Sequence, residues 1–527
     1  MPVNANIIGS FFNHAQRQPE RLAIKAGRDE ISYGALADIG RKIAGALHPV
    51  LKTKRIGILA SRSIAAYAGI VGAAWAGATY VPLNMKWPEE RLVTLMNDLD
   101  LDALIVDHNG AKLLTAKVLE NAPSLIIRSD EADAIPGTLP FSKLVKCTHD
   151  QPVHRGAEEL GYIVFTSGST GMPKGVMVSN GSLKRYLDET EKWAKFTRDE
   201  RIAEAHDITF DLSVHNMFLA WRAGAALYLM SALDMMAPQA FIRKHDITAW
   251  MSVPTIVNNM RRAKKLSEGM FPSLRLSVFC GEPLAMPTVN AWQEAAPNSV
   301  IENIYGPTEC TIVCTRQQLT DPPLVTEKRG ILAIGPAYEN FEIAICDEEG
   351  NHLPDGETGE IALASPQLSN GYFNAPEQTA KAFRTIKGKR WYYTGDLGYR
   401  DENGIFHHMG RTDNQIKMKG NRIELEEVET HLRKVCQTEL ATVVAWPILE
   451  GIPQGLVGFT TSKGMDEGDI KKAMMKSLPE YMVPARIVIK SEMPRNINDK
   501  IDRKALLVEL DAPGLETPVA EKSELPA

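Results

Sequence analysis

The sequence predicts an α/β fold in its large N-terminal region, then a barrel-like β section, then a small α+β unit at the C-terminus. In the N-terminal region, helical patterns alternate with short β-branched runs such as Ile56–Leu59 and Trp250–Val253. This alternation is typical of parallel sheets covered by helices. After Gly330, short strands are separated by turn residues such as Glu349-Gly350 and Asp355-Gly356, which indicates an antiparallel, barrel-like section.

Further elements follow from the same patterns. Additional strands of the parallel part are expected at Leu104–Val106, Leu276–Phe279 and Ser299–Ile304, and those of the antiparallel section at Ile343–Cys346, Gly359–Ala364, Trp391–Thr394 and Gly404–His407. From Gln415 a short strand, a helix over Glu424–Val435 and more strands predict the small α+β unit. The Pro- and Glu-rich segment 511–527 is expected to be disordered, and no internal repeat is visible.

Composition places the chain among ordinary globular proteins. It has 527 residues, 44% hydrophobic and 24% charged, which is too long for one core and predicts at least two domains. The formal net charge is −6 and no basic stripe is present, so we expect no nucleic-acid partner. The six cysteines form no CxxC pair, and the spacing of Cys310 and Cys314 is a poor metal signal. We therefore expect unpaired thiols in the reducing cytoplasm.

One segment has the length of a membrane span. Ile64–Leu83 comprises 20 residues without a charge. It is rich in alanine and glycine and runs into Pro82, so we interpret it as a buried helix followed by a strand at Thr79–Val81. Residues Met1–Arg17 lack the pattern of a signal peptide. These features predict a soluble, cytoplasmic protein without a membrane partner.

A glycine-rich loop follows an apolar run at Tyr162–Phe165. It reads Thr166-Ser167-Gly168-Ser169-Thr170-Gly171-Met172-Pro173-Lys174-Gly175. Glycines allow close approach to phosphate oxygens, hydroxyls supply donors, and the lysine supplies a positive charge. The loop lacks the GK[ST] ending of a P-loop kinase, and a flexible linker is the plain alternative.

The complete loop resembles the signature of the adenylate-forming superfamily, which includes acyl-CoA synthetases, luciferases and peptide-synthetase adenylation domains. Other stretches resemble the family's motifs in the same order along the chain: Ala76–Leu83, Tyr305-Gly306-Pro307-Thr308-Glu309, Gly359-Glu360, Gly371-Tyr372, Pro376-Glu377, Tyr393-Thr394-Gly395-Asp396, Gly410–Asp413 and Lys500–Lys504. The resemblance implies a core domain over 1–410, a hinge over 411–414 and a small mobile C-terminal domain over 415–510.

The resemblance also implies roles for these residues. Thr166, Ser167, Gly168, Ser169, Thr170 and Lys174 would hold the triphosphate of ATP, while Tyr305, Asn303 and Gly281 would surround adenine. Thr308 would bind the α-phosphate, and Glu309 would bind Mg²⁺, which favours oxygen ligands. Asp396 would accept both ribose hydroxyls, and Arg411 would meet ribose or phosphate. The alternatives are a solvated turn for the loop, a packing tyrosine at 305, a surface glutamate at 309 and an Asp-capped turn at 396.

Two further roles belong to the C-terminal part of the chain. Lys500 corresponds to the adenylation lysine, which would balance the charge that builds up as pyrophosphate leaves. Asp499 stands where glycine is usual, which puts the local turn in doubt. Asp413 corresponds to the hinge residue, with a simple turn as the alternative, and Lys504 is interpreted as a solvated helix residue.

The segment Phe210-Asp211-Leu212-Ser213-Val214 indicates the class of acid. In the related amino-acid enzymes this aspartate pairs with the substrate's α-ammonium group, and a buried carboxylate needs such a cation. The pocket positions of the family correspond to Leu212, His215, Met251, Val278, Cys280, Ile304, Ile312 and Val313. They predict a small, mostly aliphatic amino acid. His215 could instead accept a polar substituent, or simply pack in the core.

Several stretches resemble stand-alone D-alanine–carrier protein ligases, notably Phe279–Glu282, Gln415–Lys417 and Arg422–Glu427. We therefore expect aminoacyl-AMP formation with release of pyrophosphate, then transfer to a phosphopantetheine thiol. The segment after Lys500 is too short for a carrier domain, so a separate carrier protein is expected. Its contacts could be Lys471, Lys472, Lys476 and Arg486, or these could form an ordinary solvated face.

Three alternatives remain at this point. An acyl-CoA synthetase that acts on a small acid shares the fold and the first step, and Asp211 argues against it. The missing GK[ST] sequence argues against a P-loop kinase. A non-catalytic homologue would have lost Lys500, Glu309 or Asp396, and all three are present.

Overall fold

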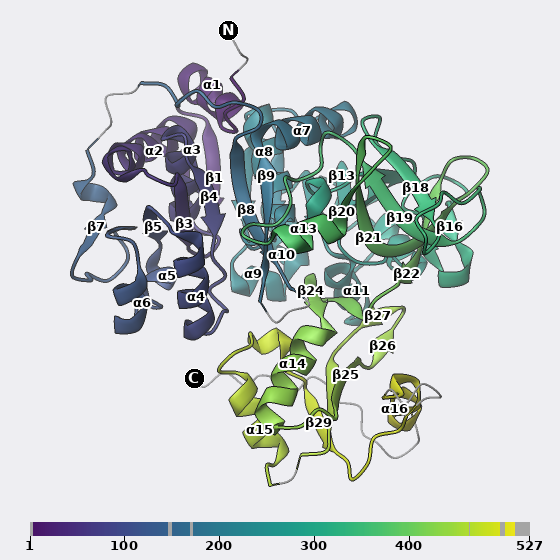
Figure 1. Cartoon of the computed structure of the whole chain (residues 1–527). Helices are drawn as coiled ribbons and strands as arrows, with labels where there is room; N and C mark the ends of the chain where they lie inside the picture. The colour runs from purple at the N-terminus through teal and green to yellow at the C-terminus, as the bar shows by residue number, and fades with distance from the viewer. Residues whose placement is uncertain (1–3, 146–149, 169–171, 463, 496–500, 512–527) are drawn as a thin grey trace. The chain divides into compact units, whose positions relative to one another are not determined.

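The computed structural model describes residues 4–145, 150–168, 172–462, 464–495 and 501–511. The chain forms two compact units (Figure 1). Unit 1 comprises Met1–Met85, Leu92–Thr166 and Lys174–Thr412, and unit 2 comprises Lys86–Arg91, Ser167–Pro173 and Asp413–Ala527.

The first sheet of unit 1 has seven strands in the order β7-β6-β5-β3-β4-β8-β9. All neighbours are parallel except β9, which returns antiparallel to β8 and pairs Lys174 with Thr166. The prediction of a parallel sheet is confirmed. The strands are β3 (Arg55–Leu59), β4 (Thr79–Pro82), β5 (Ala103–Val106), β6 (Leu125–Arg128), β7 (Thr138–Pro140), β8 (Leu160–Thr166) and β9 (Lys174–Ser179).

The uncharged segment forms helix α3 (Ile64–Trp75), followed by β4. Every residue from Ala65 to Trp75 is buried, as expected for a helix that is apolar on all sides. The hydroxyl of Ser63 caps its N-terminus by accepting a hydrogen bond from the amide of Ala66. In the described part of the chain, no helix combines the length and the apolar composition that crossing a bilayer requires.

The second sheet of unit 1 has eight strands in the order β15-β14-β13-β12-β10-β11-β1-β2. Its inner strands are parallel, and the edge strands β15 and β2 are antiparallel to their neighbours. The strands are β1 (Leu22–Ala26), β2 (Asp29–Ser32), β10 (Arg201–Glu204), β11 (Ala226–Leu229), β12 (Ala249–Ser252), β13 (Leu276–Phe279), β14 (Val300–Tyr305) and β15 (Thr315–Gln318).

The antiparallel section runs in the order β18-β19-β21-β20, with β22 paired to β21. The strand expected from Gly404 begins at Phe406, because the amide of Gly404 closes a turn onto the carbonyl of Asp401. The strands are β18 (Glu342–Cys346), β19 (Gly359–Ala364), β20 (Phe383–Ile386), β21 (Lys389–Arg400) and β22 (Phe406–Arg411), with the short pair β16 (Val325–Thr326) and β17 (Ile331–Leu332) preceding them.

Twelve further α-helices and four 3₁₀ turns complete this part of the described chain. They are α1 (Gly9–Arg17), α2 (Tyr33–Leu47), η1 (His48–Val50), α4 (Glu89–Leu99), α5 (His108–Ala111), α6 (Ala116–Asn121), η2 (Phe141–Lys143), α7 (Asn180–Ala194), α8 (Asp211–Ala223), α9 (Ala232–Met236), α10 (Pro238–Lys244), α11 (Pro254–Arg262), α12 (Met286–Ala295), η3 (Thr308–Cys310), η4 (Glu327–Arg329) and α13 (Pro376–Ala382).

Unit 2 is a small α+β unit. Its helix α14 (Leu425–Cys436) follows Glu424, one residue later than predicted, and its apolar face joins a core that contains Val428, Leu432 and Ile470. The other elements are β23 (Gln415–Met418), β24 (Asn421–Glu424), β25 (Ala441–Ala445), β26 (Ile448–Leu449), β27 (Ile452–Pro453), β28 (Leu456–Thr460), α15 (Glu467–Met474), η5 (Glu480–Met482), β29 (Arg486–Ile489) and α16 (Arg503–Leu510). Lys504 is exposed on α16.

Candidate active site

Asp211 is the first residue of α8, where unpaired amides and the helix dipole favour negative charge. Its side chain is half-buried. Burial raises the pKa values of Tyr162, Tyr186 and Cys310, and the negative charge of Asp211 adds to each of these shifts. Asp211 therefore shares its surroundings with residues from β8, α7 and η3.

His215 lies one turn further along α8 and is completely buried. Its Nδ1 atom shares a hydrogen bond with the hydroxyl of Tyr186, while its Nε2 atom has no partner among the described residues. Burial, assisted by His206, lowers the pKa of His215 to about 3. The imidazole is therefore neutral, with one ring nitrogen left for another polar group.

The predicted apolar pocket positions come together in one hydrophobic cluster. Met251 on β12 is the registered neighbour of Val278 on β13. Gly281, just after β13, has φ of +88°, and a β-carbon there would lie 3.8 Å from Cδ1 of Leu212. The buried members of this set are Leu212, Met251, Val278, Cys280, Ile304, Ile312 and Val313.

A strained turn carries Ile312, one member of this cluster. Thr311 and Ile312 both adopt positive φ, at 61° and 78°. Such angles are outliers for β-branched residues and cost about 1–3 kcal/mol each. Gly306 permits the turn, because a β-carbon there would lie 2.4 Å from Cα of Val313 and 2.8 Å from the carbonyl oxygen of Ile312. Only the absence of a side chain at 306 lets the two backbone segments meet.

Glu309 lies in η3, directly before this turn, and is completely buried. The hydroxyl of Tyr372 donates to its Oε1 atom at 2.8 Å, and the amide of Ser369 donates to its carbonyl at 2.8 Å. Lys174 places its Nζ atom 5.4 Å from the centre of the Tyr372 ring. Thr308, the first residue of η3, is partly exposed. The structure thus brings together an acidic, a basic and a phenolic group.

Asp396 is the centre of a hydrogen-bond network. Tyr305 donates to its Oδ2 atom at 2.6 Å, and Arg411, its registered neighbour across β21 and β22, donates to Oδ1 at 2.6 Å. Arg329 donates to Nδ1 of His408 at 2.6 Å, so the ring proton lies on Nε2, 3.5 Å from Asp396. Burial and the charge of Asp396 raise the pKa of Tyr305, which keeps its donating proton.

The remaining predicted residues divide between the two units. In unit 1, Asn303 uses its amide nitrogen to donate to the carbonyls of Leu332 and Ala333, and the buried hydroxyl of Thr166 has no partner among the described residues. Ser167, Gly168 and Asp413 belong to unit 2, where Asp413 accepts a hydrogen bond from the amide of Gln415. Ser169, Thr170 and Lys500, like the tail from 512 onward, lie outside the described residues.

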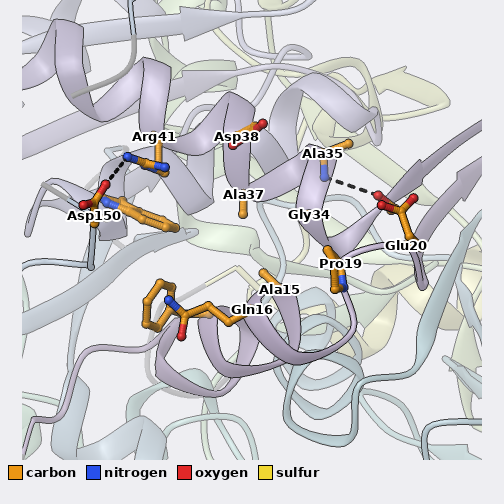
Figure 2. A pocket seen from close by; sticks show the side chains of 13 residues that line it. Ala15, Gln16, Pro19, Glu20, Gly34, Ala35, Ala37, Asp38, Arg41 and Asp150 are labelled. Atoms are coloured by element: carbon orange, nitrogen blue, oxygen red, sulfur yellow. Dashed lines mark hydrogen bonds and ion pairs between the residues drawn. The ribbon is translucent and has the colours of Figure 1, made fainter. Parts of the chain in front are cut away.

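A surface pocket elsewhere in unit 1 contains none of the predicted residues. It lies between α1 and α2, with a volume of about 450 Å³. Figure 2 shows Arg41 directed toward Asp150 at one end of this pocket, where the two side chains form an ion pair. This pocket is therefore separate from the predicted site residues.

Sequence reasoning missed the partners that hold the predicted residues. Tyr372 was part of a motif without a role, whereas Gln367, His408 and Arg329 stand in no motif. All four touch predicted residues or their neighbours. Only the Gly371-Tyr372 motif could have pointed to any of them.

Comparison with known proteins shows the family of the chain. Residues 11–373 match the family described as AMP-binding enzyme. Over 459 residues the chain is 33% identical to the D-alanine–D-alanyl carrier protein ligase of Bacillus cereus strain G9842, covering 84% of this chain and 86% of that protein. The Vibrio cholerae adenylation domain AlmE, solved in complex with glycyl-adenosine-5'-phosphate, gives a TM-score of 0.87 at 31% identity, covering 97% of this chain and 98% of AlmE.

A third similar protein is IdnL7, whose crystal structure gives a TM-score of 0.72 at 29% identity and covers 96% of this chain and 99% of IdnL7. The family match spans more than half of the chain, and the ligase similarity extends over most of both sequences. The chain therefore belongs to the AMP-binding enzyme family and is an adenylate-forming ligase.

Proposed function

We propose that this enzyme activates a small α-amino acid, glycine first among them, as the aminoacyl-adenylate and passes it to the thiol of a separate carrier protein. The observation that carries the proposal is Asp211, a half-buried carboxylate at the start of α8 beside an apolar cluster. A carboxylate in such a place is well matched to an α-ammonium group, because opposite charges attract strongly in partly buried surroundings.

The size of the acid follows from the walls of the cluster. Met251, Ile304 and Ile312 are bulky and buried, which favours a substrate with little or no side chain. Two of the similar proteins agree with this choice, since one is named for D-alanine and another was solved with glycyl-adenosine-5'-phosphate.

In the first half-reaction, a carboxylate oxygen of the amino acid attacks the α-phosphorus of ATP, and the bond to pyrophosphate breaks. The hydroxyl of Thr166, which has no partner among the described residues, and the cation of Lys174 suit the phosphates. Tyr305 and Asp396 suit adenine and ribose, and Asn303 and Gly281 are proposed to line the adenine site. Lys500 would balance the charge that develops on the departing phosphates, and Thr308 would bind the α-phosphate.

Glu309 fits a magnesium ion, because it is a buried carboxylate beside Thr308 and Mg²⁺ is usually held by one or two carboxylates together with substrate phosphates. When bound, the ion would neutralise phosphate charge. Among the described residues, no cluster of three or more acidic, histidine or cysteine side chains forms a dedicated metal cage, and such a site does not need one.

In the second half-reaction, a thiolate attacks the acyl carbon, the thioester forms and AMP leaves. We assign the thiol to the phosphopantetheine arm of a carrier protein, in keeping with the name of the Bacillus cereus ligase. Asp413, the first residue of the last segment of unit 2, is proposed as the hinge between the two half-reactions. A reaction that needs ATP and a reduced thiol is expected in the cytoplasm.

The test is amino-acid-dependent exchange of pyrophosphate into ATP. We expect glycine, alanine or serine to support the fastest exchange, and phenylalanine, benzoate and long fatty acids to support little. Fastest exchange with benzoate or a fatty acid would contradict the amino-acid assignment.

The carrier step needs its own measurement. Enzyme, ATP and the best amino acid are incubated with phosphopantetheinylated carrier, and the carrier is weighed by mass spectrometry. We expect one added aminoacyl group, and loading that slows with salt if Lys472 and Lys476, which are exposed in unit 2, steer the encounter. Efficient acylation of free coenzyme A with no carrier loading would identify an acyl-CoA synthetase instead.

A further inference from the structure

We propose that Gln367 is a positioning residue that holds the strained turn at Thr311-Ile312 and thereby sets which acids the pocket accepts. The inference rests on the proposed function in one respect: Ile312 and Val313 are taken as walls of the acid pocket. Gln367 lies between β19 and α13, and its side chain is completely buried.

The side-chain amide of Gln367 reaches three backbone carbonyls of this turn. Its Nε2 atom donates to the carbonyls of Cys310 at 3.0 Å, Thr311 at 3.3 Å and Val313 at 2.9 Å. Two N–H groups thus serve three acceptors on both sides of Ile312. No other side chain type of this length presents two donors and one acceptor without a charge.

The orientation of the amide follows from the turn, because the three backbone carbonyls only accept hydrogen bonds and the nitrogen must therefore face them. At the other end of the amide, Asn340 donates from Nδ2 to Oε1 of Gln367 at 3.0 Å. The turn also donates a hydrogen bond to Gln367, from the hydroxyl of Thr311 to the carbonyl of Gln367 at 2.8 Å. The amide of Ser369 donates to the carbonyl of Glu309. Hydrogen bonds from the segment 367–369 therefore reach both ends of the stretch from Glu309 to Val313.

The turn needs such support for a physical reason. Two consecutive β-branched residues at positive φ are disfavoured by their own side chains and persist only where surrounding contacts determine them. The carbonyls of a buried turn also need partners, because an unpaired buried acceptor is costly. Without the Gln367 amide, we expect the turn to relax toward ordinary angles, which would move the side chain of Ile312 in the pocket wall.

The experiment compares three variants with the wild-type enzyme. Gln367→Met keeps the length and removes all donors, Gln367→Glu replaces the donors with a carboxylate beside carbonyls, and Gln367→Asn keeps the amide but shortens its reach. Gln239→Met, the same change on α10, is the matched control. For each, pyrophosphate exchange is measured with the wild type's best acid and with its next larger homologue, together with circular dichroism and urea unfolding.

We expect Gln367→Met and Gln367→Glu to raise the KM for the best acid by about tenfold, since several hydrogen bonds are lost. The KM for ATP should stay within about twofold of wild type, and the preference for the best acid over its larger homologue should fall at least about fivefold. The control should leave both ratios unchanged. A purely structural role would lower the active fraction and kcat without changing KM or the preference between acids.

Unchanged KM and preference in folded variants would overturn the inference, and so would loss of folding in all three, because it would show that Gln367 maintains the core rather than the pocket. Failure of the proposed function is seen separately, in the wild type. If the wild type prefers an acid that is not an amino acid, the same comparison is made with that acid and its homologue, and the positioning role is judged on the same ratios.

Discussion

The proposed amino-acid pocket and the Asp396 network are built in different ways. The residues proposed to line the pocket belong to an apolar cluster that includes a strained turn, to which the neutral amide of Gln367 donates hydrogen bonds. The network is polar, and its charged partners Asp396 and Arg411 face each other across paired strands. Changes in the pocket should therefore act on the acid alone, whereas changes in the network should act on the nucleotide.

The largest effect is expected for Asp211→Asn. Removing the charge that faces the substrate ammonium in a partly dry site costs about 3–5 kcal/mol, which is more than a hundredfold in kcat/KM for the amino acid. The KM for ATP should change little. The measurement is exchange kinetics with each substrate varied, with Asp207→Asn as the control on the same segment. Normal kinetics with the best amino acid would remove Asp211 from the proposed role.

Asp396→Asn should give the opposite pattern. The variant loses the charged acceptor proposed for the ribose hydroxyls, and hydrogen bonds to a charged group are worth roughly 1.5–3 kcal/mol, so the KM for ATP should rise about ten- to a hundredfold. The KM for the amino acid should stay near wild type. Asp401→Asn, in the nearby turn, serves as the control. Equal increases in both KM values would mean that pocket and network act as one region.

The pH dependence of stability tests whether the imidazole of His215 is shielded from water in the proposed pocket. Its pKa of about 3 lies below the ordinary value of 6.5, so the unfolded chain takes up a proton first as the pH falls, and this destabilises the fold. Between pH 6.5 and pH 5 the loss is about 2 kcal/mol at roughly 1.4 kcal/mol per pH unit. It would continue down to the folded pKa.

The measurement is urea unfolding of wild type and His215→Gln at pH 7, 6 and 5. Wild type alone is not diagnostic, because burial raises the pKa of Glu302 to about 7 and that group stabilises the fold as the pH falls through the same range. The difference between the two proteins removes this contribution. A difference that is independent of pH would show that His215 is not desolvated as described.

Patterns in the sequence were sufficient for the fold class, because burial on two faces of a sheet leaves long apolar runs and turns leave polar breaks. They also predicted which residues line the substrate pocket; the structure places the apolar ones in one hydrophobic cluster, and their role as pocket walls stays a prediction. Sequence patterns could not reveal the hydrogen bonds from Gln367 to the turn at Thr311-Ile312. Gln367 is 54 to 57 positions away from the carbonyls that it binds, and positive φ at Thr311 and Ile312 contradicts their local preferences. Likewise, nothing local links His408 to Arg329.

The smallest effect is expected for Thr166→Val, and it sharpens the comparison on the nucleotide side. The hydroxyl of Thr166 is buried and has no partner among the described residues, as if kept for a ligand. Valine has the same shape without the hydroxyl, so the ligand-free enzyme should be unchanged or slightly more stable. The loss of one hydrogen bond worth about 0.5–1.5 kcal/mol should raise the KM for ATP about two- to tenfold.

Ser129→Ala is the control, because Ser129 also has a buried hydroxyl without a partner in the described chain, and it belongs to none of the motifs. The control should share the effect on stability and leave the KM for ATP unchanged. Urea unfolding without nucleotide and exchange kinetics with varied ATP separate the two effects. A loss of stability with an unchanged KM for ATP would show that the Thr166 hydroxyl serves the fold and not the phosphates.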